Sequence, residues 1–318
     1  MRLVSESTVL LFPGQGSQSV GMSKDLAGQY STAKILFEEA DSILGFHLSR
    51  LMWEGPESDL NETINTQPAL YVHSVAALNV LKQTYPDFRA GSLAGHSLGE
   101  LTALTVAGAL DFRQGLQLVR LRGELMKKAG EISPGGMAAI LGLEITDLEE
   151  VCVKASDSTG VVQIANDNCP GQVVISGDRN AVDRAIAGAK AQGAKRAIPL
   201  AVSIAAHSPL MATIQAEWDA AVDSAGLVEP GVPVVGNVHA DYLKTAEDAK
   251  LDIKSQMQSR VRWTESIQKL ITAGFRTFLE VGNGAVLIGL LKRISSVDGV
   301  IGTTLGSPED FNKLADLI

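Results

Sequence analysis

Residues Gly95-His96-Ser97-Leu98-Gly99 form a G-x-S-x-G pentad between a short apolar stretch and a helical pattern. In such a nucleophile elbow the chain turns so sharply that only glycine tolerates the crowding on either side of the serine. The turn exposes the serine hydroxyl and points the next backbone N–H at a developing oxyanion. The pattern favours acyl transfer through a serine ester. Because glycine and serine are common, an accidental pentad is the alternative.

A nucleophilic serine needs a general base, and the chain holds five histidines. His96 adjoins the serine, but adjacent side chains on an elbow point apart. His207 precedes Ser208 and Pro209, a serine cap followed by proline at the first helical position. We therefore predict His207 as the base, with a histidine in an ordinary loop as the alternative. No aspartate is singled out to orient it, so a Ser/His dyad held by a backbone carbonyl stays open.

Arg122 falls in the middle of the apolar side when residues 115–128 are placed on a helical wheel. An arginine buried there is costly unless an anion meets its planar fork. The position favours a clamp for a substrate carboxylate. A structural salt bridge to a buried Asp or Glu is the alternative.

The loop Gly14-Gln15-Gly16 follows a predicted buried strand at residues 8–12. It is not a phosphate loop, because no Gly-Lys-Ser/Thr follows and Ser19 stands where G-x-G-x-x-G needs its third glycine. A glutamine in such a tight loop could instead direct its backbone N–H at an oxyanion.

Composition restricts the class of protein. The chain has 318 residues, 45% of them hydrophobic, and a net charge of −9, which argues against general nucleic-acid binding. No apolar run approaches the roughly 18 residues of a membrane span, and Met1 to Leu11 lacks the core of a secretory peptide. Cys152 and Cys169 are expected to be reduced, and no Cys/His cluster has metal-ligand spacing. We expect a cytoplasmic enzyme with no metal, no membrane partner and no nucleic-acid partner.

The order of elements changes at Ser133-Pro134-Gly135-Gly136. Before that break the pattern is mixed α/β, with helices expected at residues 25–44, 67–82, 98–109 and 111–128. After it, strands and helices follow the order βαββαβ, ending in a strand at 195–202, which is the ferredoxin-like pattern. The predicted fold class is α/β: a large α/β-hydrolase-like domain (1–131 and 204–318) with an inserted small ferredoxin-like α+β domain (132–203).

Several motifs stand in order along the chain: Pro13-Gly14-Gln15-Gly16-Ser17-Gln18, Gly95 to Glu100, Leu121-Arg122-Gly123 and His207 to Met211. Together they resemble the malonyl-CoA:acyl carrier protein transacylase family, the loading enzymes of bacterial type II fatty-acid synthesis. The resemblance runs from about Val9 to Leu305.

This resemblance implies a role for each matching residue. Ser97 would be the nucleophile and His207 its base, while the backbone N–H groups of Gln15 and Leu98 would form the oxyanion hole. Arg122 would bind the free carboxylate of the malonyl group. The implied reaction is ping-pong transfer through a malonyl-serine.

The same resemblance assigns the backbone carbonyl of Gln256 to orient the histidine. It assigns Met126 and Asn166 to line the acyl and pantetheine cleft between the two domains. The implied substrates are malonyl-CoA and an acidic acyl carrier protein, with no cofactor because the CoA thioester is itself a substrate. We expect a monomer. A local basic surface is predicted to meet the carrier, with ordinary solvated faces as the alternative, from Arg184, Lys190, Lys195, Arg196, Arg260, Lys292 and Arg293.

Other functions stay open at this point. A discrete acyltransferase that serves a polyketide synthase would share the chemistry and differ in its carrier. An acyl-thioester hydrolase is disfavoured by Arg122, and a general α/β-hydrolase by the βαββαβ insertion. A non-catalytic binding module would explain neither the elbow nor the arginine. Ile204-Ala205-Ala206 leaves room beside the histidine, so branched extender units also stay open.

Overall fold

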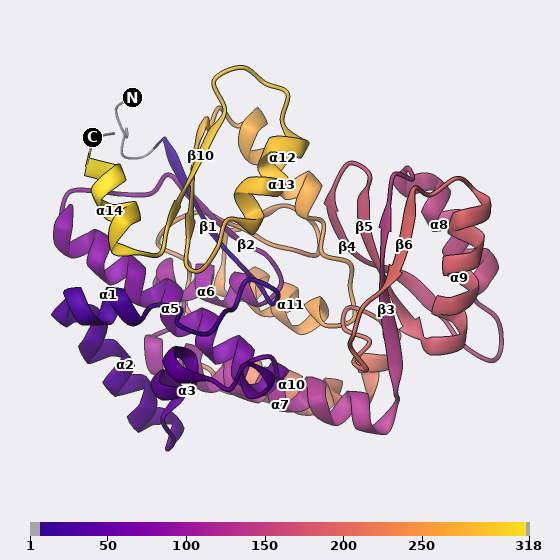
Figure 1. Ribbon diagram of the computed structural model, residues 1–318, viewed down its shortest axis with the longest axis horizontal. Helices are drawn as coiled ribbons and strands as arrows, with labels where there is room; N and C mark the ends of the chain where they lie inside the picture. The colour runs from indigo at the N-terminus through magenta and orange to yellow at the C-terminus, as the bar shows by residue number, and fades with distance from the viewer. Residues whose placement is uncertain (1–6, 316–318) are drawn as a thin grey trace.

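The computed structural model describes residues 7–315 and contains two β-sheets (Figure 1). The larger sheet has six strands in the order β10-β9-β1-β2-β7-β8, all parallel except β8. Its strands are β1 (Thr8–Phe12), β2 (Ser92–Gly95), β7 (Val234–Val235), β8 (Tyr242–Leu243), β9 (Thr277–Val281) and β10 (Ile301–Leu305).

Helices cover both faces of this sheet, which explains why residues 9–12 of β1 are all apolar. Leu10 and Phe12 enter a core with helices of the N-terminal half, whereas Val9 and Leu11 enter a second core with α12 and α13. Alternate side chains of a strand point to opposite faces, so a doubly covered strand needs both sets apolar. The helices are α1 (Lys24–Gln29), α2 (Ser31–Leu44), α3 (Leu48–Glu54), α4 (Glu57–Leu60), α5 (Thr63–Thr84), α6 (Leu98–Val106), α7 (Phe112–Ile132), the 3-10 helix η1 (Pro209–Ile214), α10 (Gln215–Ser224), α11 (Ala246–Gln256), α12 (Trp263–Thr272), α13 (Val286–Ile294) and α14 (Pro308–Ala315).

The smaller sheet lies at one end of the molecule with two helices packed on it (Figure 1). Its antiparallel order β4-β5-β3-β6 gives the ferredoxin-like arrangement, with a core of its own. The predicted fold class, a large α/β unit with a small α+β unit, is confirmed. The elements are β3 (Gly135–Leu141), α8 (Ile145–Ala155), β4 (Val162–Cys169), β5 (Gln172–Asp178), α9 (Arg179–Ala191) and β6 (Arg196–Pro199).

Local boundaries differ from the sequence prediction at several elements. The helices expected at 67–82, 98–109 and 111–128 are Thr63–Thr84, Leu98–Val106 and Phe112–Ile132. The helix expected at 25–44 is two helices, because Tyr30 is extended between them and its ring packs on Phe311. The strand expected at 195–202 is shorter, Arg196–Pro199, although Leu200 N still donates to the Met137 carbonyl oxygen at 2.9 Å. The helix that Ser208 caps is a short 3-10 helix.

Strand β10 was not predicted at all. It lies at the edge of the large sheet, and its residues are mostly half-buried. The apolar signal that marks a central strand is therefore weak there. Within residues 7–315, no helix is both long and apolar enough to cross a membrane. Residues 1–6, on which part of the leader prediction rests, lie outside the described residues.

Candidate active site

The serine elbow forms where two central strands end side by side. Strands β1 and β2 are parallel with Phe12 opposite Gly95, so the loop after β1 and the elbow share one edge of the sheet. A Cβ on Gly95 would lie 1.9 Å from the backbone of Gly99, and a Cβ on Gly99 would lie 2.0 Å from the Phe12 carbonyl oxygen. Ser97 takes φ 52° and ψ −110°. Such crowding and strain are typical of a nucleophile elbow.

Ser97 and His207 are in direct contact. Ser97 Oγ lies 2.8 Å from His207 Nε2, and His207 Nδ1 lies 2.8 Å from the carbonyl oxygen of Gln256 and 3.2 Å from that of Ser259. Carbonyl oxygens only accept hydrogen bonds, so Nδ1 carries the proton and Nε2 is left to accept from the serine. The histidine is thus oriented by backbone carbonyls rather than by a carboxylate.

The environment of His207 keeps the imidazole neutral. Its side chain is buried, and it lies near the charge of Arg122. Burial, followed by repulsion from Arg122, lowers the pKa of His207 to about 3. A neutral imidazole at pH 7 can accept the serine proton, as a general base must.

His96 does not compete for this place. Its Nε2 lies 2.8 Å from Asn168 Oδ1, and its ring packs edge-on against Trp263. The expectation that the two neighbouring elbow side chains point apart therefore agrees with their different partners.

Arg122 reaches the serine from α7 as a buried cation. It is 1% exposed and donates to three oxygens: Gln67 Oε1 at 2.9 Å, Gln256 Oε1 at 2.8 Å and Ser97 Oγ at 3.1 Å. Burial lowers its pKa to about 10. Across the described part of the chain, its Nε has no hydrogen-bond partner and no Asp or Glu pairs with it. The alternative of a direct structural salt bridge is therefore wrong within residues 7–315.

A cleft of about 540 Å³ opens above the serine between the two sheets. Both sheets contribute walls, since Met137, Asn166 and Val174 come from the small one. Gln256 lies buried behind this cleft. The remaining residues singled out from the sequence all line it: Gln15, Ser97, Leu98, Arg122, Met126, Asn166 and His207.

The two expected oxyanion donors come from the loop after β1 and from the first residue of α6. Leu98 is the first residue of α6, and N–H groups in a first helical turn have no partner within the helix. Gln15 follows β1, and its side-chain Oε1 accepts from Thr63 Oγ1 at 2.9 Å. That bond ties the side chain of Gln15 to α5, and both Gln15 and Leu98 line the cleft.

Sequence reasoning missed the residues that hold the elbow from behind. Asn237 Oδ1 accepts from Ser97 N at 2.8 Å, and Asn237 Nδ2 donates to the Gly95 carbonyl at 2.7 Å. Glu100 and Asp252 both accept from the backbone of this same asparagine. Glu100 could have been found as Arg122 was, because it is the only charge in the apolar helix α6. Asn237 carried no such signal, since it lies in an irregular loop.

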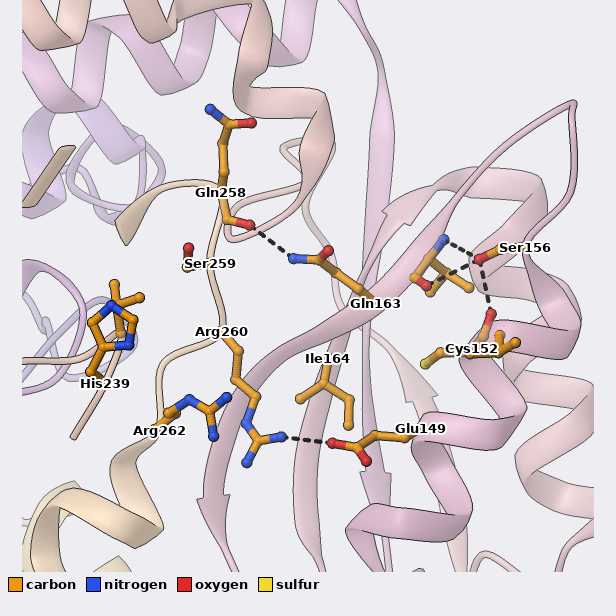
Figure 2. A pocket seen from close by; sticks show the side chains of 13 residues that line it. Glu149, Cys152, Ser156, Gln163, Ile164, His239, Gln258, Ser259, Arg260 and Arg262 are labelled. Atoms are coloured by element: carbon orange, nitrogen blue, oxygen red, sulfur yellow. Dashed lines mark hydrogen bonds and ion pairs between the residues drawn. The ribbon is translucent and has the colours of Figure 1, made fainter. Parts of the chain in front are cut away.

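A second cavity, of about 670 Å³, lies between strand β4 and residues 258–262 (Figure 2). Gln163 of β4 donates from Nε2 to the carbonyl oxygens of His207 at 2.8 Å and Gln258 at 2.9 Å. The small sheet thus holds both segments that orient the imidazole. Figure 2 also shows Arg260 directed at Glu149 of α8.

Arg260 pairs with three acids through its two terminal nitrogens. It contacts Glu149 at 2.9 Å, Asp167 at 3.4 Å and Glu265 at 2.8 Å. The second cavity therefore offers no free cation at this position. No group of three or more His, Cys, Asp or Glu side chains among residues 7–315 could hold a metal ion.

Comparison with known proteins now identifies the family. The sequence matches the acyl transferase domain family over residues 9–304. It is 46% identical to a malonyl CoA-acyl carrier protein transacylase of Bacillus subtilis over 287 residues, covering 90% of this chain and 89% of the relative. A transacylase of the same description from Haemophilus influenzae is 42% identical, with 97% and 98% covered. This chain belongs to the malonyl CoA-acyl carrier protein transacylase family.

Solved structures agree with this transacylase assignment. An acyl carrier protein S-malonyltransferase from Vibrio cholerae superposes with a TM-score of 0.92 at 40% identity, covering 97% of this chain and 99% of that one. A malonyl-transacylase in complex with a type II PKS acyl-carrier protein gives 0.92 at 38% identity, with the same coverage. The chain is an acyltransferase, and the general α/β-hydrolase and binding-module readings are wrong.

Proposed function

We propose that this transacylase moves a malonyl group from malonyl-CoA to the phosphopantetheine thiol of an acyl carrier protein in fatty-acid synthesis. The observation that carries the proposal is Arg122. It is a buried guanidinium that reaches Ser97 Oγ at 3.1 Å and that no carboxylate within residues 7–315 neutralises by direct contact. A substrate with a free carboxylate beside its reactive carbonyl suits this pairing of nucleophile and cation.

Acylation begins at the serine. Oγ of Ser97 forms a bond to the thioester carbonyl carbon while its proton moves to Nε2 of His207. The carbonyl electron pair moves onto oxygen, where the backbone N–H groups of Gln15 and Leu98 stabilise the negative charge. When the intermediate collapses, the C–S bond breaks, and the CoA sulfur leaves with the electron pair and takes the proton from Nε2. Malonyl-Ser97 and CoA are the products.

Deacylation runs the same steps with the carrier thiol. His207 accepts the thiol proton, the sulfur attacks the malonyl ester, and Ser97 Oγ leaves and recovers a proton from Nε2. The carbonyls of Gln256 and Ser259 hold Nδ1–H throughout, so Nε2 is the only ring nitrogen that exchanges protons. We assign Met126 and Asn166 to the walls that receive the acyl and pantetheine groups.

Selectivity follows from the burial of Arg122. Malonyl supplies a carboxylate that can contact the guanidinium directly, whereas acetyl brings no anion to it. Leaving a buried charge without its partner costs about 2–5 kcal/mol. The preference for malonyl over acetyl should therefore be large and should disappear with the arginine.

The test is the intact mass of the protein after mixing with malonyl-CoA, acetyl-CoA or methylmalonyl-CoA, in wild type and in Ser97→Ala. We expect a malonyl adduct that requires Ser97 and moves to carrier protein when that is added. An acetyl adduct without a malonyl adduct would overturn the role of Arg122. Free acid accumulating without an adduct would indicate the hydrolase, and methylmalonyl turnover close to malonyl turnover would overturn strict malonyl selectivity.

A type II polyketide carrier is the second candidate acceptor. It is favoured by the similarity to the malonyl-transacylase that was solved in complex with a type II PKS acyl-carrier protein. Competition between a fatty-acid carrier and a polyketide carrier for the malonyl-enzyme separates the two. A higher kcat/KM for the polyketide carrier would reverse our choice.

We propose that the carrier docks near Lys195 and Arg196, which are exposed at the start of β6. Other members of the expected basic surface are already engaged, since Arg184 pairs with Asp157 and Arg260 with three acids. Lys195→Glu with Arg196→Glu should raise the KM for carrier protein and leave the KM for malonyl-CoA unchanged. An unchanged KM for the carrier would place docking elsewhere.

We further propose that residues 1–131 and 204–318 act as the large catalytic domain and residues 132–203 as the small one. Separate hydrophobic cores in the two sheets support this division. We propose a cytoplasmic monomer that needs no cofactor, and the two cysteines, both unpaired, fit a reducing compartment. Light scattering on the purified protein tests the monomer, and full activity after dialysis against a chelator tests the absence of a metal.

A further inference from the structure

Two buried carboxyl groups meet behind the serine elbow. Glu100 of α6 is 0% exposed and Asp252 of α11 is 4% exposed. The backbone N–H of Asn237 donates to both, at 3.1 Å to Glu100 Oε1 and at 3.0 Å to Asp252 Oδ2. One N–H can serve two carboxyl groups only if these lie side by side. The mechanism described above uses neither acid.

Two carboxylates in contact and away from water cannot both be ionised. Burial, followed by the neighbouring Asp252, holds the pKa of Glu100 well above its usual range. The pair nevertheless keeps one negative charge favourable, because main-chain N–H groups of Asn237 and Val238 donate to Asp252. The geometry thus favours one proton and one charge for the two groups together.

The side chain of Gln256 connects this pair to the substrate-binding cation. Its Nε2 donates to Glu100 Oε2 and, at 2.9 Å, to the carbonyl oxygen of Ser97. Its Oε1 accepts from Arg122 Nη2 at 2.8 Å. The carboxamide dipole therefore has its positive end toward the acids and its negative end toward the guanidinium.

Arg122 otherwise has neutral oxygen and sulfur partners, from Gln67, Ser97 and Met126. A buried cation needs a compensating charge, but a carboxylate in direct contact would occupy the fork that a substrate carboxylate should meet. A counter-charge placed one carboxamide away meets both requirements.

We propose that Glu100 and Asp252 share a single proton, and that the one negative charge of the pair is the buried counter-charge of Arg122, acting through Gln256. The pair consists of positioning residues for substrate binding. Its benefit for malonyl recognition rests on the proposed function, whereas its charge state does not. Arg122 on α7 faces the pair, and while burial lowers the pKa of Arg122, the charge of Glu100 raises it by a smaller amount.

The first test is spectroscopic. A protonated carboxyl group has an infrared carbonyl band separate from those of carboxylates. We expect this band in the wild-type protein at pH 7, and we expect Glu100→Gln and Asp252→Asn each to remove it, because an amide then replaces the proton and the remaining acid ionises. No such band in wild type would mean two charges, and a band persisting in both variants would mean none. Either result overturns the proposal.

The second test is a double-mutant cycle read by thermal unfolding. Each single amide keeps one charge on the pair, so we expect small effects. The double variant Glu100→Gln/Asp252→Asn leaves Arg122 without a counter-charge and should lower the unfolding midpoint by about 5–10 °C beyond the sum of the singles. An additive cycle would contradict a shared proton.

Adding Arg122→Met to the double variant should recover most of that loss, because the unpaired cation is then gone. Arg260→Met is the matched control, since this arginine has its own acids and should recover nothing. Recovery by both, or by neither, would overturn the link to Arg122.

None of these measurements uses malonyl-CoA. A protein that passes them without transferring malonyl would refute the proposed function alone, and one that transfers malonyl but fails them would refute the pair alone.

Discussion

Two arginines in neighbouring cavities behave as opposites. Arg122 is 1% exposed and its contacts are amide, hydroxyl and thioether groups, whereas the side chain of Arg260 is 18% exposed and touches three carboxylates. The second cavity is the larger, at about 670 Å³ against about 540 Å³, yet its cation is already neutralised. Binding of an anionic substrate therefore depends on whether the cation already has a carboxylate partner, and not on the size of the cavity.

The largest effect that would test this comparison is on malonyl transfer. Replacing Arg122 by Met should lower kcat/KM for malonyl-CoA by a factor of roughly 30 to 4,000, because the substrate carboxylate loses its buried partner. This factor corresponds to about 2–5 kcal/mol of lost transition-state stabilisation. The matched Arg260→Met should change malonyl kcat/KM by less than about threefold. Steady-state kinetics with a fixed carrier protein measure both. Equal losses in the two variants would break the comparison.

A smaller effect is expected at the wall that separates the cavities. Gln163→Leu removes two hydrogen bonds to the main chain around His207. We expect kcat/KM to fall by an amount that corresponds to about 1–3 kcal/mol of lost transition-state stabilisation. The loss should be the same for malonyl and acetyl substrates, because Gln163 acts on the base and not on the carboxylate. Gln163→Glu, which keeps the shape but replaces the donor, should not restore activity. A loss confined to malonyl would show that the wall serves Arg122 instead.

The two arginines should also differ in how strongly salt changes their contribution to the free energy of unfolding. Arg260→Met leaves three acids close together and should cost about 1–2 kcal/mol in the free energy of unfolding at low salt. The cost should shrink as salt rises, because this cluster is partly exposed to solvent. The effect of Arg122→Met on stability should vary less with salt. Urea unfolding at two ionic strengths measures both, and identical salt dependence would contradict the assignment.

The smallest expected effect is a shift in a pH profile. Repulsion from Arg122 is the second cause, after burial, that lowers the pKa of His207. Arg122→Met should therefore raise that pKa. Because the neutral imidazole is the active form, activity is lost as pH falls through the pKa, and the acid limb should move to higher pH.

The rate at which a neutral fluorophosphonate modifies Ser97 reports this limb without requiring a malonyl carboxylate. Arg260→Met is again the control and should leave the limb in place. An unmoved limb in Arg122→Met would mean that burial alone sets the pKa of His207.

How far the sequence reached can be seen from individual residues. The elbow glycines follow from local sterics, and helical periodicity alone marks Arg122 as unusual on α7. Each of these signals is contained in a single turn or a single helix. The roles that we give Ser97, His207 and Arg122 stay predictions until the kinetic tests are made.

Tertiary structure alone decided what surrounds them. Gln256, Asn237 and Asp252 come to the elbow from more than 130 residues along the chain, and only the shared edge of the parallel sheet brings them there. That Arg122 lacks a carboxylate while Arg260 has three could not be read from the sequence either. Local sterics and periodicity fix which residue types sit on an element, whereas the packing of distant elements fixes which charges meet.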